Sequence, residues 1–135
     1  MRALALFLTV VAGHLSAQAT LGEAARGARA AWMAHDTQSL VGQGATLVVQ
    51  IPGTNPSAAL DRAQAIELLR RYQRPAVEVA IRIRRVTEMA GGHGVVELER
   101  EYVVGGTEDV RRETIFLRYR QTEARWDLTE LRAAP

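Results

Sequence analysis

The chain has 135 residues, a length typical of one domain with a single core. It contains no cysteine, which excludes disulfide bonds and thiolate metal sites. Its 17 basic side chains are all arginines and are balanced by 15 acidic ones, and the formal net charge of +2 is too small for a nucleic-acid-binding surface.

The first 19 residues have the pattern of a secretory signal peptide. Arg2 supplies a positive charge, Ala3 to Ala12 forms a hydrophobic run, and Ala17-Gln18-Ala19 is a small-x-small cleavage site. The hydrophobic run is too short to span a bilayer. We therefore expect cleavage near Ala19 and a periplasmic or secreted domain of residues 20–135; the alternative is a buried N-terminal helix.

Two capping signatures predict the main helices. Thr20 to Glu23 fits a capping box that opens a helix from Leu21 to about His35. Asp36 to Val41 predicts a short second helix or turn. Asp61 to Gln64 is a second capping signature, and the helix that follows it runs to about Gln73.

Strands account for most of the remaining chain. Ala45 to Ile51 is a β-branched run that predicts one strand. Ala76 to Arg132 alternates apolar and polar side chains in four segments, which predicts an antiparallel meander. The breaks between the four segments are Ala90-Gly91-Gly92-His93, Gly105-Gly106-Thr107-Glu108 and Gln121-Thr122-Glu123-Ala124. The fold class is therefore α+β, with a curved sheet of one strand plus four packed on two main helices.

The register follows from pairing apolar residues with apolar ones and opposite charges with each other. Across the second break this rule places Leu98 opposite Ile115. The other predicted partners are Arg100 with Glu113 across that break, Arg84 with Glu99 across the first, and Tyr119 with Trp126 across the third. In the first segment, the residues expected to face the core are Val77, Val79, Ile81 and Ile83, with Glu78 outward. A bulge is expected at Arg84-Arg85.

Four short motifs stand at the ends of these elements: Ala31 to Asp36, Asp61 to Ala65, Tyr102 to Gly105 and Trp126 to Leu131. With the order of elements, they resemble the nuclear transport factor two-like superfamily of cone-shaped α+β domains. The resemblance covers nearly all of the mature chain. More narrowly, it is similar to exported bacterial domains of unknown function within that superfamily.

The superfamily includes ketosteroid isomerase-like and polyketide cyclase-like enzymes, in which acidic residues, His or Tyr inside the cone perform acid–base work. The isomerase-like pattern has a carboxylate on the first strand, whereas Ala45 to Ile51 has none. It has a Tyr on the first helix, where this chain offers Trp32. The resemblance therefore implies a fold, and the motifs that carry it are packing and capping signals.

Charged residues interrupt the predicted core-facing rows at one end of the sheet. They are Arg100, Glu113, Glu130 and Arg132. The predicted register places Glu113 between Arg100 and Arg132. One interpretation is a satisfied ion cluster at the rim of the core, and the other is a pocket mouth where the arginines meet an anionic ligand group.

Candidate site residues follow from this end of the sheet and from the aromatic residues, which could line a cavity or pack the core. The candidate ligand-binding residues are Trp32, Tyr72, Arg100, Tyr102, Glu113 and Arg132. The catalytic candidates are Glu113, Glu130 and His35; the other interpretation of His35 is a helix C-terminal residue that complements the helix dipole.

These observations favour an exported, non-catalytic domain that binds a small apolar or anionic molecule in the cone, or a protein partner through its sheet. One alternative is a small isomerase- or cyclase-type enzyme with Glu113 or Glu130 as base and Arg100 as electrostatic partner. Another is a purely structural homodimer in which Phe116, on the otherwise charged outer face, forms part of the contact. We expect no cofactor, and the scattered histidines lack metal-ligand spacing.

Overall fold

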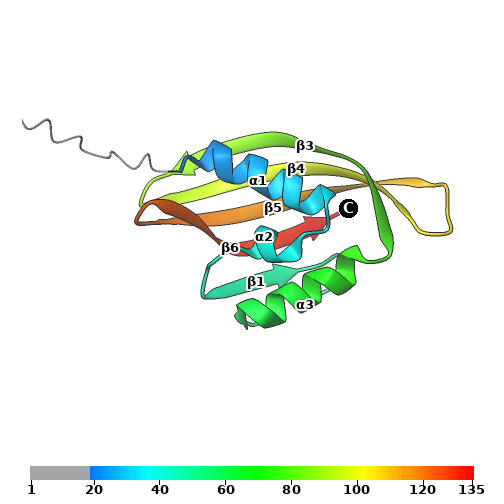
Figure 1. The fold of residues 1–135 in the computed structure, drawn as a ribbon, viewed down its shortest axis with the longest axis horizontal. Coiled ribbons are helices and arrows are strands. Elements are labelled where there is room, and N and C mark those ends of the chain that lie inside the picture. The colour runs from blue at the N-terminus through cyan, green and yellow to red at the C-terminus, as the bar shows by residue number, and fades with distance from the viewer. Residues whose placement is uncertain (1–18) are drawn as a thin grey trace, which may run out of the picture.

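The structure is a computed structural model that describes residues 19–135 (Figure 1). Residues 1–18 of the predicted signal peptide lie outside the described residues, so cleavage stays a prediction. The helices are α1 (Leu21–Met33), α2 (Thr37–Val41) and α3 (Arg62–Gln73). The strands are β1 (Thr46–Gln50), β2 (Leu60–Asp61), β3 (Ala76–Met89), β4 (His93–Val104), β5 (Val110–Thr122) and β6 (Arg125–Ala134).

The two main helices begin where the capping signatures predict. The Thr20 hydroxyl accepts a hydrogen bond from the Glu23 main-chain N–H at 3.1 Å. At the start of α3 the capping box is complete, because the Asp61 carboxylate accepts from the Gln64 N–H at 2.8 Å and the Gln64 side chain accepts from the Asp61 N–H at 3.0 Å. At α1 only the Thr20 half of the predicted box is formed. Both caps satisfy main-chain donors that the first helical turn leaves without partners.

The helix α1 ends at Met33, two residues before its predicted end at His35. Ala34 is the C-cap, and His35 has a φ of 52°, in the left-handed region that usually favours glycine. The main-chain N–H of His35 donates to the Trp32 carbonyl at 3.0 Å. His35 thus lies beyond the helix, and the reversal directs its imidazole towards β3.

The strands form one curved sheet in the order β2-β1-β6-β5-β4-β3 (Figure 1). The predicted meander is β3 to β6, and the α+β fold with a curved, unclosed sheet is confirmed. The early strand β1 joins it in parallel beside β6, with Val49 opposite Leu131, while β2 pairs antiparallel with β1. Both contacts are long-range, so alternation within a strand does not specify them.

The predicted register between β4 and β5 is confirmed. Leu98 lies opposite Ile115 and Arg100 opposite Glu113. Apolar partners therefore fill the inner face, and the two buried charges are placed on neighbouring strands with opposite signs.

Between β3 and β4 the predicted register is wrong by two residues. Met89, not Ala90, pairs with His93 at the turn, and the bulge expected near Arg84 adds one further step between Ile83 and Arg85. Glu99 therefore lies opposite Arg82. Its carboxylate still accepts a diagonal hydrogen bond from Arg84 Nε, at 2.6 Å.

A second bulge in β3, between Glu78 and Ala80, reverses the expected faces at the start of the strand. Val77 and Val79, which were expected to face the core, are 59% and 50% exposed. Glu78, expected to face outward, has a side chain only 2% exposed. The extra residue in the bulge is the physical reason, because one inserted residue shifts the alternation by one.

A third bulge lies in β6. Arg118 pairs with Glu130 and Tyr119 with Leu128, so Thr129 is the extra residue. The predicted pairing of Tyr119 with Trp126 is wrong by two residues for a separate reason, because the turn is tighter than predicted and Thr122 pairs with Arg125. The Thr129 hydroxyl donates to the Arg118 carbonyl at 3.1 Å. Beyond the bulge, the odd-numbered residues of β6 are the ones that face the core. Placing Glu130 and Arg132 on the core-facing row was therefore wrong.

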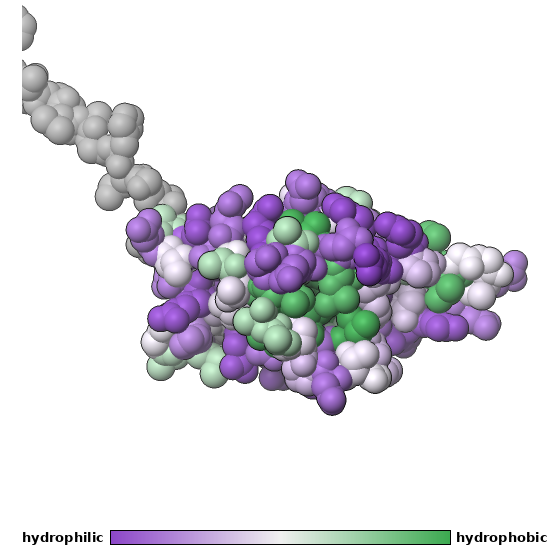
Figure 2. Space-filling model, turned by 90° about the horizontal axis from the view of Figure 1, so that it is seen from below, coloured by the Kyte–Doolittle hydropathy of each residue, from purple (hydrophilic) through white to green (hydrophobic). Residues whose placement is uncertain are grey.

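The helices cover the inner face of the sheet, with α1 against β3 and β4, and α3 against β1 and β2. The largest fully buried hydrophobic side chains between these layers include Trp32, Leu69, Leu98, Ile115 and Leu131. From the side of α3 and β1, the surface shows a hydrophobic area surrounded by hydrophilic residues (Figure 2). Among the described residues, no helix is long and apolar enough to cross a membrane.

Candidate functional site

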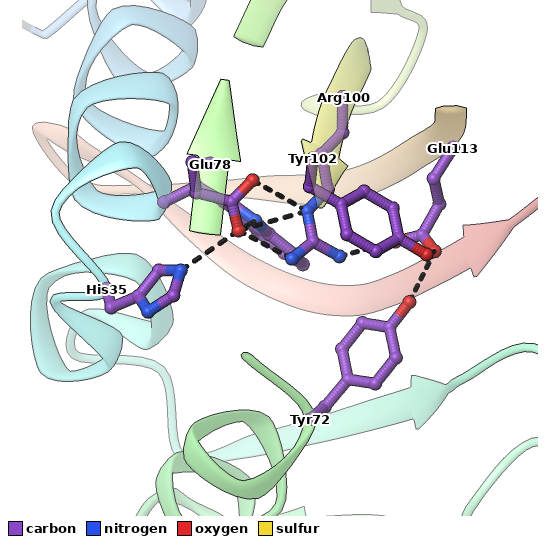
Figure 3. Close-up of polar contacts among 7 residues, drawn as sticks. His35, Tyr72, Glu78, Arg100, Tyr102 and Glu113 are labelled. Atoms are coloured by element: carbon purple, nitrogen blue, oxygen red, sulfur yellow. Dashed lines mark hydrogen bonds and ion pairs between the residues drawn. The ribbon is translucent and has the colours of Figure 1, made fainter. Parts of the chain in front are cut away.

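Seven side chains meet between α1, the end of α3 and the inner face of the sheet (Figure 3). Arg100 stands at their centre, and we refer to them as the Arg100 cluster. Its members are Trp32, His35, Tyr72, Glu78, Arg100, Tyr102 and Glu113.

The Arg100 guanidinium is 1% exposed and holds a carboxylate on each side. Towards β3, its Nε lies 2.8 Å from Glu78 Oε2 and its Nη2 lies 2.5 Å from Glu78 Oε1. Towards β5, its Nη1 lies 3.1 Å from Glu113 Oε1. The side chains of both glutamates are 2% exposed, so all three charges are removed from water together. Such a group is tolerated in a core only when each charge is paired and hydrogen-bonded.

The remaining acceptor positions of the two carboxylates are also used. Glu113 Oε2 accepts from the Tyr72 hydroxyl at 2.5 Å and from the Tyr102 hydroxyl at 3.5 Å. Glu78 Oε1 accepts from the indole N–H of Trp32 at 3.3 Å, and His35 Nε2 lies 2.9 Å from the same oxygen. Neither carboxylate is isolated.

Three aromatic rings surround the guanidinium. Its central carbon lies 3.9 Å from the ring centroid of Tyr102, 5.2 Å from that of Trp32 and 5.6 Å from that of Tyr72. The Trp32 and Tyr72 rings also meet edge to face at 6.5 Å. Rings at these distances attract a cation through their quadrupoles, so the cluster is an aromatic cage around Arg100.

The ionisation of the cluster follows from these contacts. Burial, together with the hydrogen bond to Glu113 and its negative charge, raises the pKa of Tyr72 well above its ordinary value. Burial by itself lowers the pKa of Arg100, but the hydrogen bonds and charges of Glu78 and Glu113 outweigh it and raise that pKa. At neutral pH the tyrosine is a neutral donor and the arginine a cation.

The structure brings five of the six candidate ligand-binding residues into the cluster. They are Trp32, Tyr72, Arg100, Tyr102 and Glu113. The exception is Arg132, which is exposed and has its guanidinium 4.3 Å from the ring centroid of Phe116. Arg132 therefore does not flank Glu113. The bulge at Thr129 turns its side chain to the outer face, and the tighter third turn shifts the register by two further residues.

Two of the three catalytic candidates belong to the Arg100 cluster, and one does not. Glu113 is inside the cluster, and His35 is at its edge with a side chain 30% exposed. Glu130 lies outside the cluster, with a side chain 41% exposed and 3.8 Å from Arg118. The described residues contain no group of three potential metal ligands among His, Cys, Asp and Glu.

Glu78 is the member that the alternation pattern missed. It stands between two valines, so period two assigns it to the outer face. One signal in the sequence could have found it. A core-facing arginine has donors for more than one carboxylate, and Glu78 is the acidic residue of β3 nearest to Arg100.

Comparison with known proteins identifies the fold of the chain. No family model matches the chain, and no curated protein matches it in sequence. Solved structures match it over most of its length. A ketosteroid isomerase-like protein from Erwinia carotovora atroseptica aligns over 84% of this chain and 91% of its own, with 15% identity and a TM-score of 0.68.

Two further structures align as well. A putative calcium/calmodulin-dependent protein kinase type II association domain from Thiobacillus denitrificans covers 88% of this chain and 97% of its own, with 16% identity and a TM-score of 0.70. A DUF4783 family protein from Bacteroides uniformis covers 81% and 94%, with 13% identity and a TM-score of 0.67.

The chain therefore has the nuclear transport factor two-like, ketosteroid isomerase-like fold, as its motifs and element order predicted. At these identities the likeness shows the fold alone, because one fold carries many functions. The function has to be argued from the site.

Proposed function

We propose that the chain is a non-catalytic binding domain, exported after loss of its first 19 residues, that works through the outer face of its sheet. The partner that this face fits best is a second copy of the same chain. We infer the absence of catalysis from one observation. Both buried carboxylates, Glu78 and Glu113, already accept hydrogen bonds from other residues of the protein.

Acid–base catalysis in this cone would need a carboxylate that is free to exchange a proton with a substrate. Glu113 already accepts hydrogen bonds from Arg100 and Tyr72, and Glu78 accepts from Arg100 at two positions. The first strand, β1, offers no carboxylate. The position where a substrate would meet an acid and a base is thus filled by a guanidinium and its partners.

The outer face supports binding because its charges run in alternating stripes. On β4, Glu99 and Glu101 point outward, and arginines flank them on both sides. Arg82 pairs with Glu101 at 3.1 Å and with Glu99 at 3.8 Å, and Arg84 also contacts Glu99. The other ion pairs across this face are Arg112–Glu101 at 3.4 Å and Arg118–Glu130 at 3.8 Å. One acidic strand lies between two basic ones.

This pattern is complementary to itself. When two copies pack face to face about a twofold axis that runs parallel to β4 and β5 and between them, the acidic β4 of each copy lies over the basic β5 of the other. Closed twofold pairing of this kind uses one patch twice. Phe116 lies close to that axis, beside a hollow of about 370 Å³ that Val95 and Arg132 also line.

Light scattering on the mature chain, residues 20–135, tests this proposal. We expect a dimer for the wild type, a monomer for Phe116→Arg, and a dimer for the control Ala63→Arg, which adds the same charge to the exposed side of α3. Raising the salt concentration should weaken the wild-type dimer because the stripes are exposed. A wild-type chain that stays monomeric at high protein concentration would contradict the proposal.

A second candidate function is binding of a small ligand at the edge of the Arg100 cluster, and the exposure of His35 favours it. The rings of Trp32, Tyr72 and Tyr102 already enclose the Arg100 guanidinium, so a ligand would enter beside His35, whose side chain is 30% exposed. An anionic ligand would have to displace Glu78 or Glu113 from Arg100. Thermal shift of the wild type across a metabolite panel, with the Arg100→Met variant as comparison, separates this candidate from pairing through the sheet.

A further inference from the structure

A cavity separate from the Arg100 cluster lies between α1, α2 and the sheet. It has a volume of about 230 Å³, is open to solvent on one side, and is lined by α1, α2 with the two residues that follow it, β5 and β6. The residues that decide its character are Gly27, Ala28, Leu40, Tyr119, Trp126 and Leu128. It shares no residue with the Arg100 cluster, and we call it the Tyr119 cavity.

Small residues on α1 create the space. Ala24, Gly27 and Ala28 form the wall on the helix side. Gly27 is exposed, and a methyl group placed there would meet no atom within 4 Å, so the cavity opens to solvent at this point of the helix. Because side chains at i, i+3 and i+4 share one face of a helix, these three residues present a shallow strip opposite Trp126 and Leu128.

The side chain of Tyr119 supplies one polar group. Tyr119 is 4% exposed, and among the described residues its hydroxyl has no hydrogen-bond partner. Within residues 19–135, the fully buried side-chain nitrogen and oxygen atoms without a hydrogen-bond partner are both on Gln73. The Tyr119 hydroxyl is not among them, so solvent reaches it, and the cavity that Tyr119 lines is the route we infer. Buried tyrosine hydroxyls normally find a partner, as that of Tyr72 does with Glu113.

The chemistry of the walls defines the class of ligand. Among the described residues, no charged side chain lines the cavity, and its polar side-chain groups besides the tyrosine hydroxyl are the indole N–H of Trp126 and the side chains of Ser39 and Gln43, both exposed residues. Burial raises the pKa of Tyr119, so at neutral pH the hydroxyl is intact and can donate. A cavity of roughly 150 Å³ with apolar walls accepts benzene, so this one has room for a single ring with a short substituent.

We propose that the Tyr119 cavity binds a small neutral molecule of about one ring, whose oxygen accepts a hydrogen bond from the Tyr119 hydroxyl. The walls of Trp126, Leu128 and Leu40 bury the apolar part of the molecule. The open strip at Gly27 receives its edge. This site is independent of pairing through the outer face, since none of its lining residues lies on that face.

Two probes of the same shape test the proposal on the mature chain. Acetophenone carries a carbonyl oxygen, and α-methylstyrene replaces that oxygen with a methylene group. Their dissociation constants are measured by two-dimensional NMR from the amide shifts of Gly27 and Gly42. We expect the wild type to bind acetophenone about five-fold more tightly, since a neutral hydrogen bond gives an advantage of about that size.

Three variants decide the result. Tyr119→Phe should remove the preference for acetophenone, because it keeps the ring and deletes the hydroxyl, which leaves the carbonyl of acetophenone without a donor. Gly27→Leu should abolish binding of both probes by filling the cavity, while Ala30→Leu, at an exposed position that does not line the cavity, should bind as the wild type does. Circular dichroism verifies that each variant is folded. Absence of shifts at Gly27 and Gly42 at millimolar acetophenone, or unchanged binding in Gly27→Leu, would overturn the proposal whatever the oligomeric state.

Discussion

Arg100 and Glu78 form a bidentate ion pair although they are not partners in the sheet register. Arg100 lies opposite Ile81, and Glu78 lies opposite Tyr102. The guanidinium reaches back along the neighbouring strand to the carboxylate, with contacts at 2.5 and 2.8 Å. The bulge that follows Glu78 makes this possible, because it directs the carboxylate inward where regular alternation would direct it to solvent.

This pairing decides what the cone can do. Removing three charges from water costs free energy that is recovered only while every partner is present. The Arg100 cluster therefore stabilises the fold as a unit, and its centre is occupied by the protein itself.

Arg100→Met tests the unit directly. The variant keeps much of the side-chain volume and leaves Glu78 and Glu113 without their cation, so we expect the free energy of unfolding to fall by about 3–5 kcal/mol. Denaturant unfolding measures it. The triple variant Arg100→Met, Glu78→Gln, Glu113→Gln should recover more than half of the loss, since no unpaired charge remains buried.

The matched control is Arg112→Met. Arg112 also pairs with a glutamate, Glu101, but its side chain is 74% exposed, so its loss should cost less than about 1 kcal/mol. Equal costs for the two single variants would show that the burial of the cluster contributes nothing to its energetics.

The meander and the register of β4 with β5 could be predicted because both depend on local alternation. Leu98 and Arg100 point inward, as do Ile115 and Glu113, and one pairing alone satisfies both the apolar and the charged residues. The same argument failed for Glu78, Glu130 and Arg132. A bulge lies between each of these residues and the part of its strand that sets the pattern, and alternation does not reveal where one residue is inserted.

The candidate site could be predicted in part for the same reason. Arg100 and Glu113 came from the reliable register, while Trp32 and Tyr72 came from helical spacing and aromatic character. His35 reaches the site because the chain reverses after α1, a left-handed turn at a residue whose type gives little sign of it.

His35→Gly and His35→Ala form a test of that turn. Both variants remove the imidazole and its contact with Glu78. Glycine adopts the φ of 52° without steric cost, whereas alanine does not, so the glycine variant should be more stable by about 1 kcal/mol. Urea unfolding gives the difference. At Ala34, where φ is −85°, the change to glycine should instead destabilise the protein.

Glu99 tests the outer face of the sheet at low pH. The hydrogen bond from Arg84, with the charges of Arg84, Arg112 and Arg82, holds the pKa of Glu99 below its ordinary value. NMR titration of the carboxyl carbon should show this depression, and Arg84→Ala should move the pKa of Glu99 up towards about 4.3. Arg71→Ala, which removes an exposed arginine from α3, should leave the titration of Glu99 unchanged.

The sign of the stability effect follows from the depressed pKa. The contribution of Glu99 is present above its unfolded-state pKa and is lost as the pH falls through the lower folded-state pKa. The Arg84→Ala variant should therefore lose less stability than the wild type between about pH 5 and pH 2. Parallel acid-unfolding curves for the two proteins would contradict the assignment of Arg84 as the main cause.

Tyr119 gives a prediction at high pH that this composition makes easy to measure. The chain has neither lysine nor cysteine, so its three tyrosines are the side chains that titrate nearest to pH 10. Burial raises the pKa of Tyr119 in the folded protein above the value of about 10 that it has in the unfolded chain. Its contribution to stability is therefore complete below pH 10 and is lost as the pH rises through the folded-state pKa, by at most about 1.4 kcal/mol per pH unit.

Tyr119→Phe should make the alkaline decline in stability shallower by that amount, while the contribution of Tyr72 to the decline remains. Urea unfolding between pH 8 and pH 11 measures the free energy of unfolding of the wild type and of Tyr119→Phe. Below pH 9 the two free energies should differ by a constant amount. A difference that stays constant up to pH 11 would show that the Tyr119 hydroxyl ionises as readily in the folded protein as in the unfolded chain.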